Sequence, residues 1–90
     1  MESVVDAIPI SLRGELSKRL IDIVLGAERR DSIPTELAKK IIYLWRQDQL
    51  ASRAGIQALL EAALMVDAEA TFQVCESLGL KEVAVTLRNL

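Results

Sequence analysis

Few side chains of this 90-residue chain could carry out chemistry. The chain has no histidine, the commonest metal ligand and a frequent general base. Its single cysteine, Cys75, excludes an intramolecular disulfide and a cysteine-based metal cluster. The thirteen acidic residues form no grouping that stands apart from ordinary surface charge. We therefore expect a protein without catalytic activity, metal or cofactor, in which Cys75 is a small buried hydrophobic residue.

A group of basic side chains around an aromatic ring offers a second kind of chemistry, the binding of phosphate groups. Tyr43 lies among Lys39, Lys40 and Arg46 on the polar face of a predicted helix. Basic groups attract a nucleic-acid backbone, and an aromatic ring can stack on a base. The alternative is an ordinary solvated helix face, on which the Tyr43 ring lies along lysine stems.

The charge of the chain is unevenly divided between its two parts. Residues 10–53 carry nine Lys or Arg against six acids, whereas residues 54–90 carry two against five. A basic first part suits a polyanion, and an acidic second part suits a basic protein. An imbalance of this size also arises by chance in segments this short.

Hydrophobic spacing predicts an all-α chain. Gly26 and Gly79 are predicted helix stops, and a charged loop is expected over 28–32. A helix at the C-terminal end is preferred to a strand over 83–87, because Leu80, Ala84, Leu87 and Leu90 fit only the helical period. The predicted helices cover residues 12–25, 34–48, 51–66, 67–78 and 80–90.

The helix over 51–66 is the most apolar of these. From Ala54 to Val66 only Gln57 and Glu61 are polar. Since such a helix must be covered on nearly every side, we expect one domain, residues 1–90, built as a compact bundle of four to five helices around it. A short chain leaves part of that cover to a partner, which predicts a homodimer. The helix over 34–48 has a predicted inward stripe of Leu37, Ile41, Leu44 and Trp45. The expected core or dimer interface consists of Trp45, Leu59, Leu60, Leu64 and Met65.

The apolar stretches fall short of the roughly 17 to 25 residues that a membrane-spanning helix needs. The acidic start of the chain also lacks the basic flank of a signal peptide. We expect no membrane contact and a cytoplasmic location.

The segment Pro9-Ile10-Ser11-Leu12-Arg13 alternates in hydrophobicity and fits a short strand over 8–12. A helix, a polar loop and a second helix that opens Ser32-Ile33-Pro34 follow it. This order, over residues 8–47, resembles the ribbon-helix-helix family, in which strands of two chains pair and enter the major groove of DNA. The resemblance implies that Pro9, Ser11 and Arg13 face outward and that Ser11 and Arg13 contact the DNA. The alternative is an extended lead-in to an ordinary helix.

The stretch from Leu44 to Leu50, the Ala-rich helix after it and the segment from Phe72 to Gly79 resemble small archaeal antitoxin-like proteins that accompany PIN-domain ribonuclease toxins. Such proteins pair a DNA-binding part with a segment that occupies the toxin. The resemblance implies the same division here, in line with the basic and acidic parts of the chain.

We therefore expect a non-catalytic protein-interaction module, in its most specific form an antitoxin-like regulator that binds a toxin-like partner protein and also DNA. The alternative is a pure homo-oligomerisation or scaffold subunit without nucleic-acid binding. The expected nucleic-acid contacts are Ser11, Arg13, Lys39, Lys40, Tyr43 and Arg46.

Overall fold

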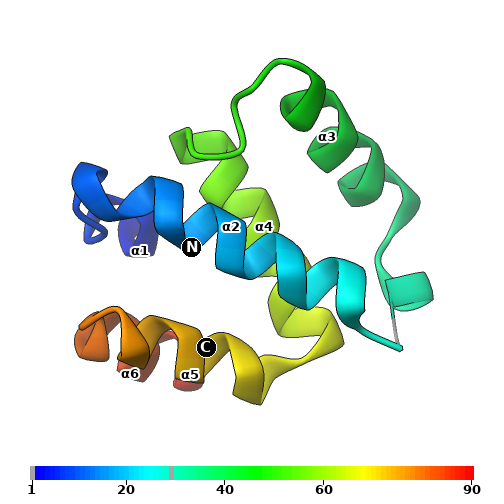
Figure 1. The fold of residues 1–90 in the computed structure, drawn as a ribbon. Coiled ribbons are helices and arrows are strands. Elements are labelled where there is room, and N and C mark those ends of the chain that lie inside the picture. Colours follow the sequence, from blue (N-terminus) through cyan, green and yellow to red (C-terminus); the bar gives the residue numbers. More distant parts are fainter. Residues whose placement is uncertain (1, 29) are drawn as a thin grey trace.

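A computed structural model of the chain describes residues 2–28 and 30–90. This part of the chain is all-α, as predicted, with six α-helices and one 3₁₀ turn (Figure 1). The predicted number of helices, four to five, was too low, because the segment before Pro9 is itself helical. The elements are α1 (Glu2–Asp6), α2 (Ile10–Gly26), η1 (Arg30–Ser32), α3 (Thr35–Arg46), α4 (Arg53–Val66), α5 (Ala68–Ser77) and α6 (Lys81–Arg88).

The strand predicted over 8–12 is wrong, because α2 already begins at Ile10. Pro9 stands directly before the helix with φ −56°, and its carbonyl accepts a hydrogen bond from the Leu12 N–H at 3.0 Å. Proline suits this place, since the N–H that it lacks has no partner in a first helical turn. The alternation of Ile8, Ile10 and Leu12 therefore reflects a turn into α2 rather than strand pairing. Ile8 is buried, whereas Ile10 is 80% exposed.

Two further segments, residues 83–87 and 28–32, can be compared with their predictions. Residues 83–87 lie inside α6, so the preferred helix is present there and the strand is not. The predicted charged loop over 28–32 contains η1, and residue 29 lies outside the described residues.

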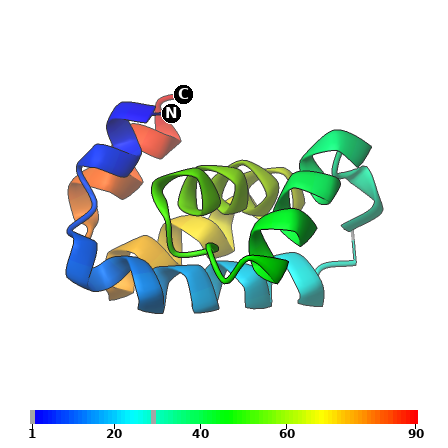
Figure 2. The same cartoon turned by 90° about the horizontal axis from the view of Figure 1, so that it is seen from above.

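The fold is organised around α4, of whose fourteen residues eight are buried. Helix α2 packs across α4 most extensively, and α1, α3 and α5 cover its other sides (Figure 2). Helix α6 packs on α5 and also contacts α1. Fully buried side chains of α2 and α4 belong to one hydrophobic cluster, which includes Leu16, Leu20, Ile56, Leu59 and Leu60.

The N-terminus of α4 is fixed closely to the loop before it. Ser52 caps the helix, because its hydroxyl accepts a hydrogen bond from the Gly55 N–H at 3.1 Å. A Cβ atom at Gly55 would overlap the carbonyl oxygens of Gln49 and Leu50. Only glycine therefore lets this loop, which also ends α3, pass so near to α4.

Helices α3 and α5 end in the same backbone motif. The Gln49 N–H donates to the Leu44 carbonyl at 2.8 Å, and the Leu80 N–H donates to the Cys75 carbonyl at 2.9 Å. Each motif places one residue in the left-handed region. This residue is Gly79 (φ 80°) after α5 but Asp48 (φ 55°) after α3.

Substitutions at these two positions should have opposite effects. We expect Asp48→Gly to raise the free energy of unfolding by about 0.5 to 1 kcal/mol, because glycine adopts positive φ without a Cβ clash. Gly79→Ala should lower it by about 1 to 2 kcal/mol. Urea unfolding followed by circular dichroism measures both. A change of the free energy of unfolding in the same direction for both variants would contradict the left-handed conformation at one of the two helix ends.

The central position of α4 predicts a large effect of truncating Leu60, which is fully buried. Leu60→Ala should lower the free energy of unfolding by about 2 to 5 kcal/mol, since it leaves a cavity in the core. Met65→Ala on the same helix is the control, because Met65 is 44% exposed, and its loss should stay below about 1 kcal/mol. Similar losses for both variants would mean that α4 is not the centre of the core.

Candidate functional site

Arg13, a predicted DNA contact, is engaged within the protein. Its Nε donates to the carbonyl of Ile8 at 3.2 Å, and its Nη2 donates to the carbonyl of Val5 at 3.1 Å. The guanidinium group therefore donates to one carbonyl of α1 and to one in the turn after it, beside the C-terminal end of the helix, where a positive charge is favourable. In this role Arg13 joins α1 to α2. Ser11 is exposed in the first turn of α2.

The other predicted nucleic-acid contacts belong to α3, and the structure does not bring them together with Arg13. Lys39, Lys40, Tyr43 and Arg46 are all exposed. Lys39 forms an ion pair with Glu36 at 3.8 Å, which lowers the net positive charge of this surface. Helices α1 and α3 lie on opposite sides of the molecule in both ribbon views (Figures 1 and 2).

The residues predicted for the core or dimer interface divide between the interior and the surface. Leu59 and Leu60 are fully buried, Leu64 is half-buried, and Met65 is exposed. Trp45 was placed on the inward stripe of its helix, but it lies outside the core and is 66% exposed. Trp45 lines an apolar recess of the surface.

This recess is an apolar groove between α2 and α3. Among the described residues, the backbones of these two helices do not come into contact, although both pack on α4. The space between them, about 370 Å³, is the α2–α3 groove. Its walls are almost wholly apolar and consist of Ile21, Leu25, Ile41, Ile42, Trp45 and Leu50.

The groove exists because α3 carries two apolar stripes and only one of them is buried. Leu37 and Ile41 follow helical spacing toward the core, and Ile41 is the only buried residue of α3. Ala38, Ile42 and Trp45 follow the same spacing beside that stripe. Ile42 is 48% exposed, and Leu25 across the groove is 62% exposed. Water therefore covers apolar side chains on both walls.

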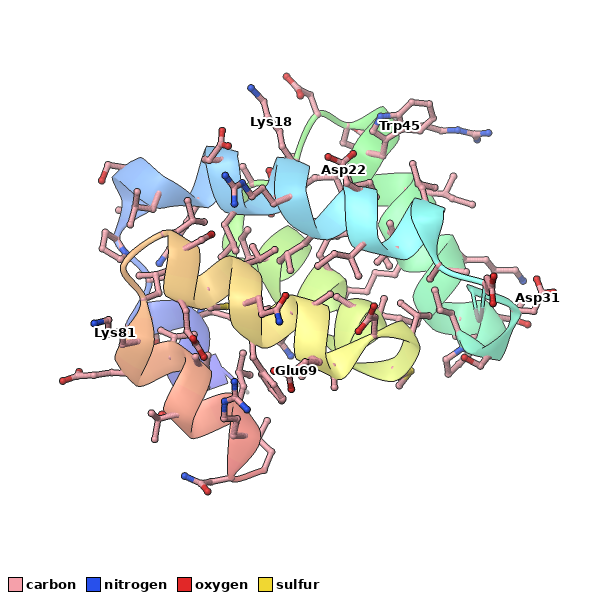
Figure 3. The ribbon with its side chains drawn as sticks, turned by 60° about the horizontal axis from the view of Figure 1, so that its bottom comes forward. Lys18, Asp22, Asp31, Trp45, Glu69 and Lys81 are labelled. Atoms are coloured by element: carbon pink, nitrogen blue, oxygen red, sulfur yellow. The ribbon has the colours of Figure 1, made fainter. Side chains whose placement is uncertain are left out.

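A more polar extension continues the groove toward the N-terminal half of α2. Trp45 and Leu50 line both parts, and Ser17, Lys18 and Asp48 line only the extension. Figure 3 shows that Lys18, Asp22 and Trp45 lie on one side of the molecule.

Four exposed charged residues, the rim charges, belong to the two segments beside this surface: Lys18 and Asp22 on α2, Arg46 as the last residue of α3, and Asp48 two residues after it. Lys18 and Asp48 line the extension itself. Within residues 2–28 and 30–90, none of the four takes part in an ion pair. Charged groups elsewhere do pair, such as Arg53 with Asp6 at 2.9 Å and Arg88 with Glu76 at 3.0 Å. The rim therefore presents two positive and two negative groups to solvent.

Sequence reasoning missed four of the groove residues: Ile21, Leu25, Ile42 and Leu50. The pairs Ile41-Ile42 and Leu44-Trp45 carried the signal, because neighbouring residues of a helix point about 100° apart and cannot both face one neighbour. The apolar side chains of α3 therefore cover too wide an arc of the helix for one neighbour. Such a helix either packs against two neighbours or leaves part of its apolar side chains on the surface.

Cys75 lies in the core on α5 and is fully buried. Burial, with a smaller contribution from the Glu76 carboxylate, raises the pKa of its thiol to about 11. Because the thiolate is the reactive form, Cys75 is a packing residue at neutral pH.

Two further features concern metals and membranes. The described residues hold no group of three or more side chains suited to bind a metal ion. Nor does any helix among them have the length and apolar character needed to cross a bilayer.

Comparison of the chain with protein-family models, curated proteins and solved structures finds no match in any of the three.

The contacts of Arg13 predict a structural role that a free surface cation lacks. Arg13→Ala should lower the free energy of unfolding by about 1 to 2 kcal/mol, because two carbonyls at and just after the end of α1 lose a charged donor. Lys40→Ala is the matched control, and it should stay within about 0.5 kcal/mol of the wild type because Lys40 is exposed. Thermal or urea unfolding of both variants measures the difference. Equal stability of the two would contradict the role of Arg13 in fixing α1.

Proposed function

We propose that this protein is a non-catalytic protein-interaction module whose binding surface is the α2–α3 groove. The groove takes an apolar helical surface of another polypeptide chain. The observation that carries this proposal is the position of Trp45, a large aromatic side chain that is 66% exposed beside an apolar recess.

The chemistry of the surface supports a protein partner. Tryptophan is enriched among the residues that dominate binding energy in protein interfaces. An apolar groove between two helices accepts the apolar face of a third helix, whose anchors recur at helical spacing. A charged rim around an apolar centre is also the usual anatomy of such interfaces. Burial of Ile42, Leu25 and Trp45 would remove apolar surface from water, which favours association.

The more specific parts of the sequence interpretation stay predictions. An antitoxin-like role with a toxin-like partner is compatible with a protein-binding groove, and so is a scaffold subunit. DNA binding through α3 would use a different surface from the groove walls, namely the side of α3 that carries Lys39 and Tyr43. A contribution of Arg13 to base reading would require it to leave its carbonyl partners, Val5 and Ile8.

Site-specific photocrosslinking tests the proposed function. A benzophenone amino acid is placed at Ile42, inside the groove, and in a matched variant at Val85, which is exposed on α6 far from the groove. In cells that make this protein, we expect a covalent protein adduct from position 42 and none from position 85. Adding Trp45→Ser to the position-42 variant should remove the adduct.

Mass spectrometry of the adduct identifies the crosslinked peptide. No protein adduct at position 42, or equal adducts at both positions, would refute the groove as a protein-binding surface. Circular dichroism of each variant checks that the helices are retained.

A further inference from the structure

We infer that the chain which occupies the α2–α3 groove is a second copy of this protein, related by a twofold axis. This inference rests on the proposed function, because it names the partner of the same surface. Two observations carry it. The rim has equal numbers of positive and negative groups, and the exposed Trp45 side chain lies beside the recess of the groove on the same surface.

A twofold interface brings one surface patch against an identical patch, so each attractive contact occurs twice. A patch with charges of one sign would repel its copy. The rim of the groove carries Lys18 and Arg46 against Asp22 and Asp48, a net charge of zero. Each positive group can therefore meet a negative group of the other copy. The four rim charges have no ion-pair partner within the described part of their own chain, so no existing pair must break on association.

The shape of the surface meets the same requirement. Trp45 projects from α3 on the side of the molecule that carries Lys18 and Asp22 (Figure 3). The apolar recess beside it, about 370 Å³, has room for an apolar side chain of a facing copy. In a twofold dimer the Trp45 side chain of each copy would pack against the recess of the other. Exposed Leu25 and Ile42 would then be covered from both sides of the axis.

The charges also argue against a strongly acidic or strongly basic partner for this surface. A strongly basic or acidic protein would satisfy only two of the four rim charges and would face repulsion from the other two. A second copy satisfies all four.

Analytical ultracentrifugation from about 1 to about 200 μM tests the self-association directly. We expect a reversible dimer whose dissociation constant rises by about 30-fold or more in Trp45→Ser, as for loss of an interface hot spot. Tyr43→Ser is the matched control, because Tyr43 is also exposed on α3 but does not line the groove, and it should leave the constant unchanged. Trp45 is the only tryptophan of the chain, so its fluorescence should shift to the blue as the dimer forms.

Charge exchange between two variants tests whether rim faces rim. Lys18→Glu with Arg46→Glu makes an acidic rim, and Asp22→Lys with Asp48→Asn makes a basic one. Each double variant alone should be monomeric, because like charges face each other across the axis. A mixture of the two in equal amounts should form a heterodimer. Circular dichroism should show unchanged helix content for each variant.

Several outcomes would overturn the second copy as partner. These are a monomer at all concentrations, a dimer that Trp45→Ser leaves intact, and charge variants that do not associate when mixed. A crosslink from position 42 to a different protein would also overturn it while supporting the proposed function. Absence of any protein adduct from position 42 would refute the proposed function itself, so the two failures are distinguishable.

Discussion

Helix α4 is apolar on almost every side, and covering it is the constraint on which the rest of the structure depends. Eight of its fourteen residues are buried, and a helix of this kind is stable in water only when neighbours enclose it. In a chain of 90 residues, α2, α5, α1 and α3 all take part in that cover. Even the loop before α4 does so, since the absence of a side chain at Gly55 lets the backbone at Gln49 and Leu50 pass directly over the helix.

The same constraint explains the surface that remains. Helix α3 contributes one stripe, centred on Ile41, to the cover of α4, and its position is fixed at its end by the close passage of the loop at Gly55. Since the backbone of α3 does not reach α2 within the described part of the chain, its second stripe with Ile42 and Trp45 faces solvent across a groove. No helix of residues 2–28 and 30–90 fills the groove. The apolar surface is thus left by the way the core is built, and association can cover it.

The sequence was informative wherever one strong local pattern decided the structure. The apolar run from Ala54 to Val66 identified the most buried helix, and Gly79 marked the end of α5 because it adopts positive φ.

The N-terminal segment was misread because alternation over five residues is also compatible with a turn. The choice between strand and turn depended on the burial of Ile8 in the core, against residues distant in sequence. Trp45 was assigned to an inward stripe because the pattern of α3 shows which residues are apolar but not how many sides of the helix have a neighbour. The structural role of Arg13 was missed, since its partners are backbone carbonyls of α1 and of the turn after it, and α1 is too short to predict from its sequence.

A dimer through the groove and a nucleic-acid contact through α3 would not exclude each other. With about 3.6 residues per turn, the side of α3 that carries Lys39 and Tyr43 lies roughly opposite Ile41, whereas Ile42 and Trp45 lie between these two sides. Covering the groove would therefore leave Lys39 and Tyr43 in solvent, with Arg46 at the border. A twofold dimer would also present two copies of this side of α3, in each of which Lys39 is paired with Glu36. The net charge of −2 resides largely elsewhere, since residues 54–90, which include α5 and α6, carry five acids against two basic residues. Any polyanion contact of α3 would therefore be strengthened by dimerisation, because two copies of this side could bind one polyanion together.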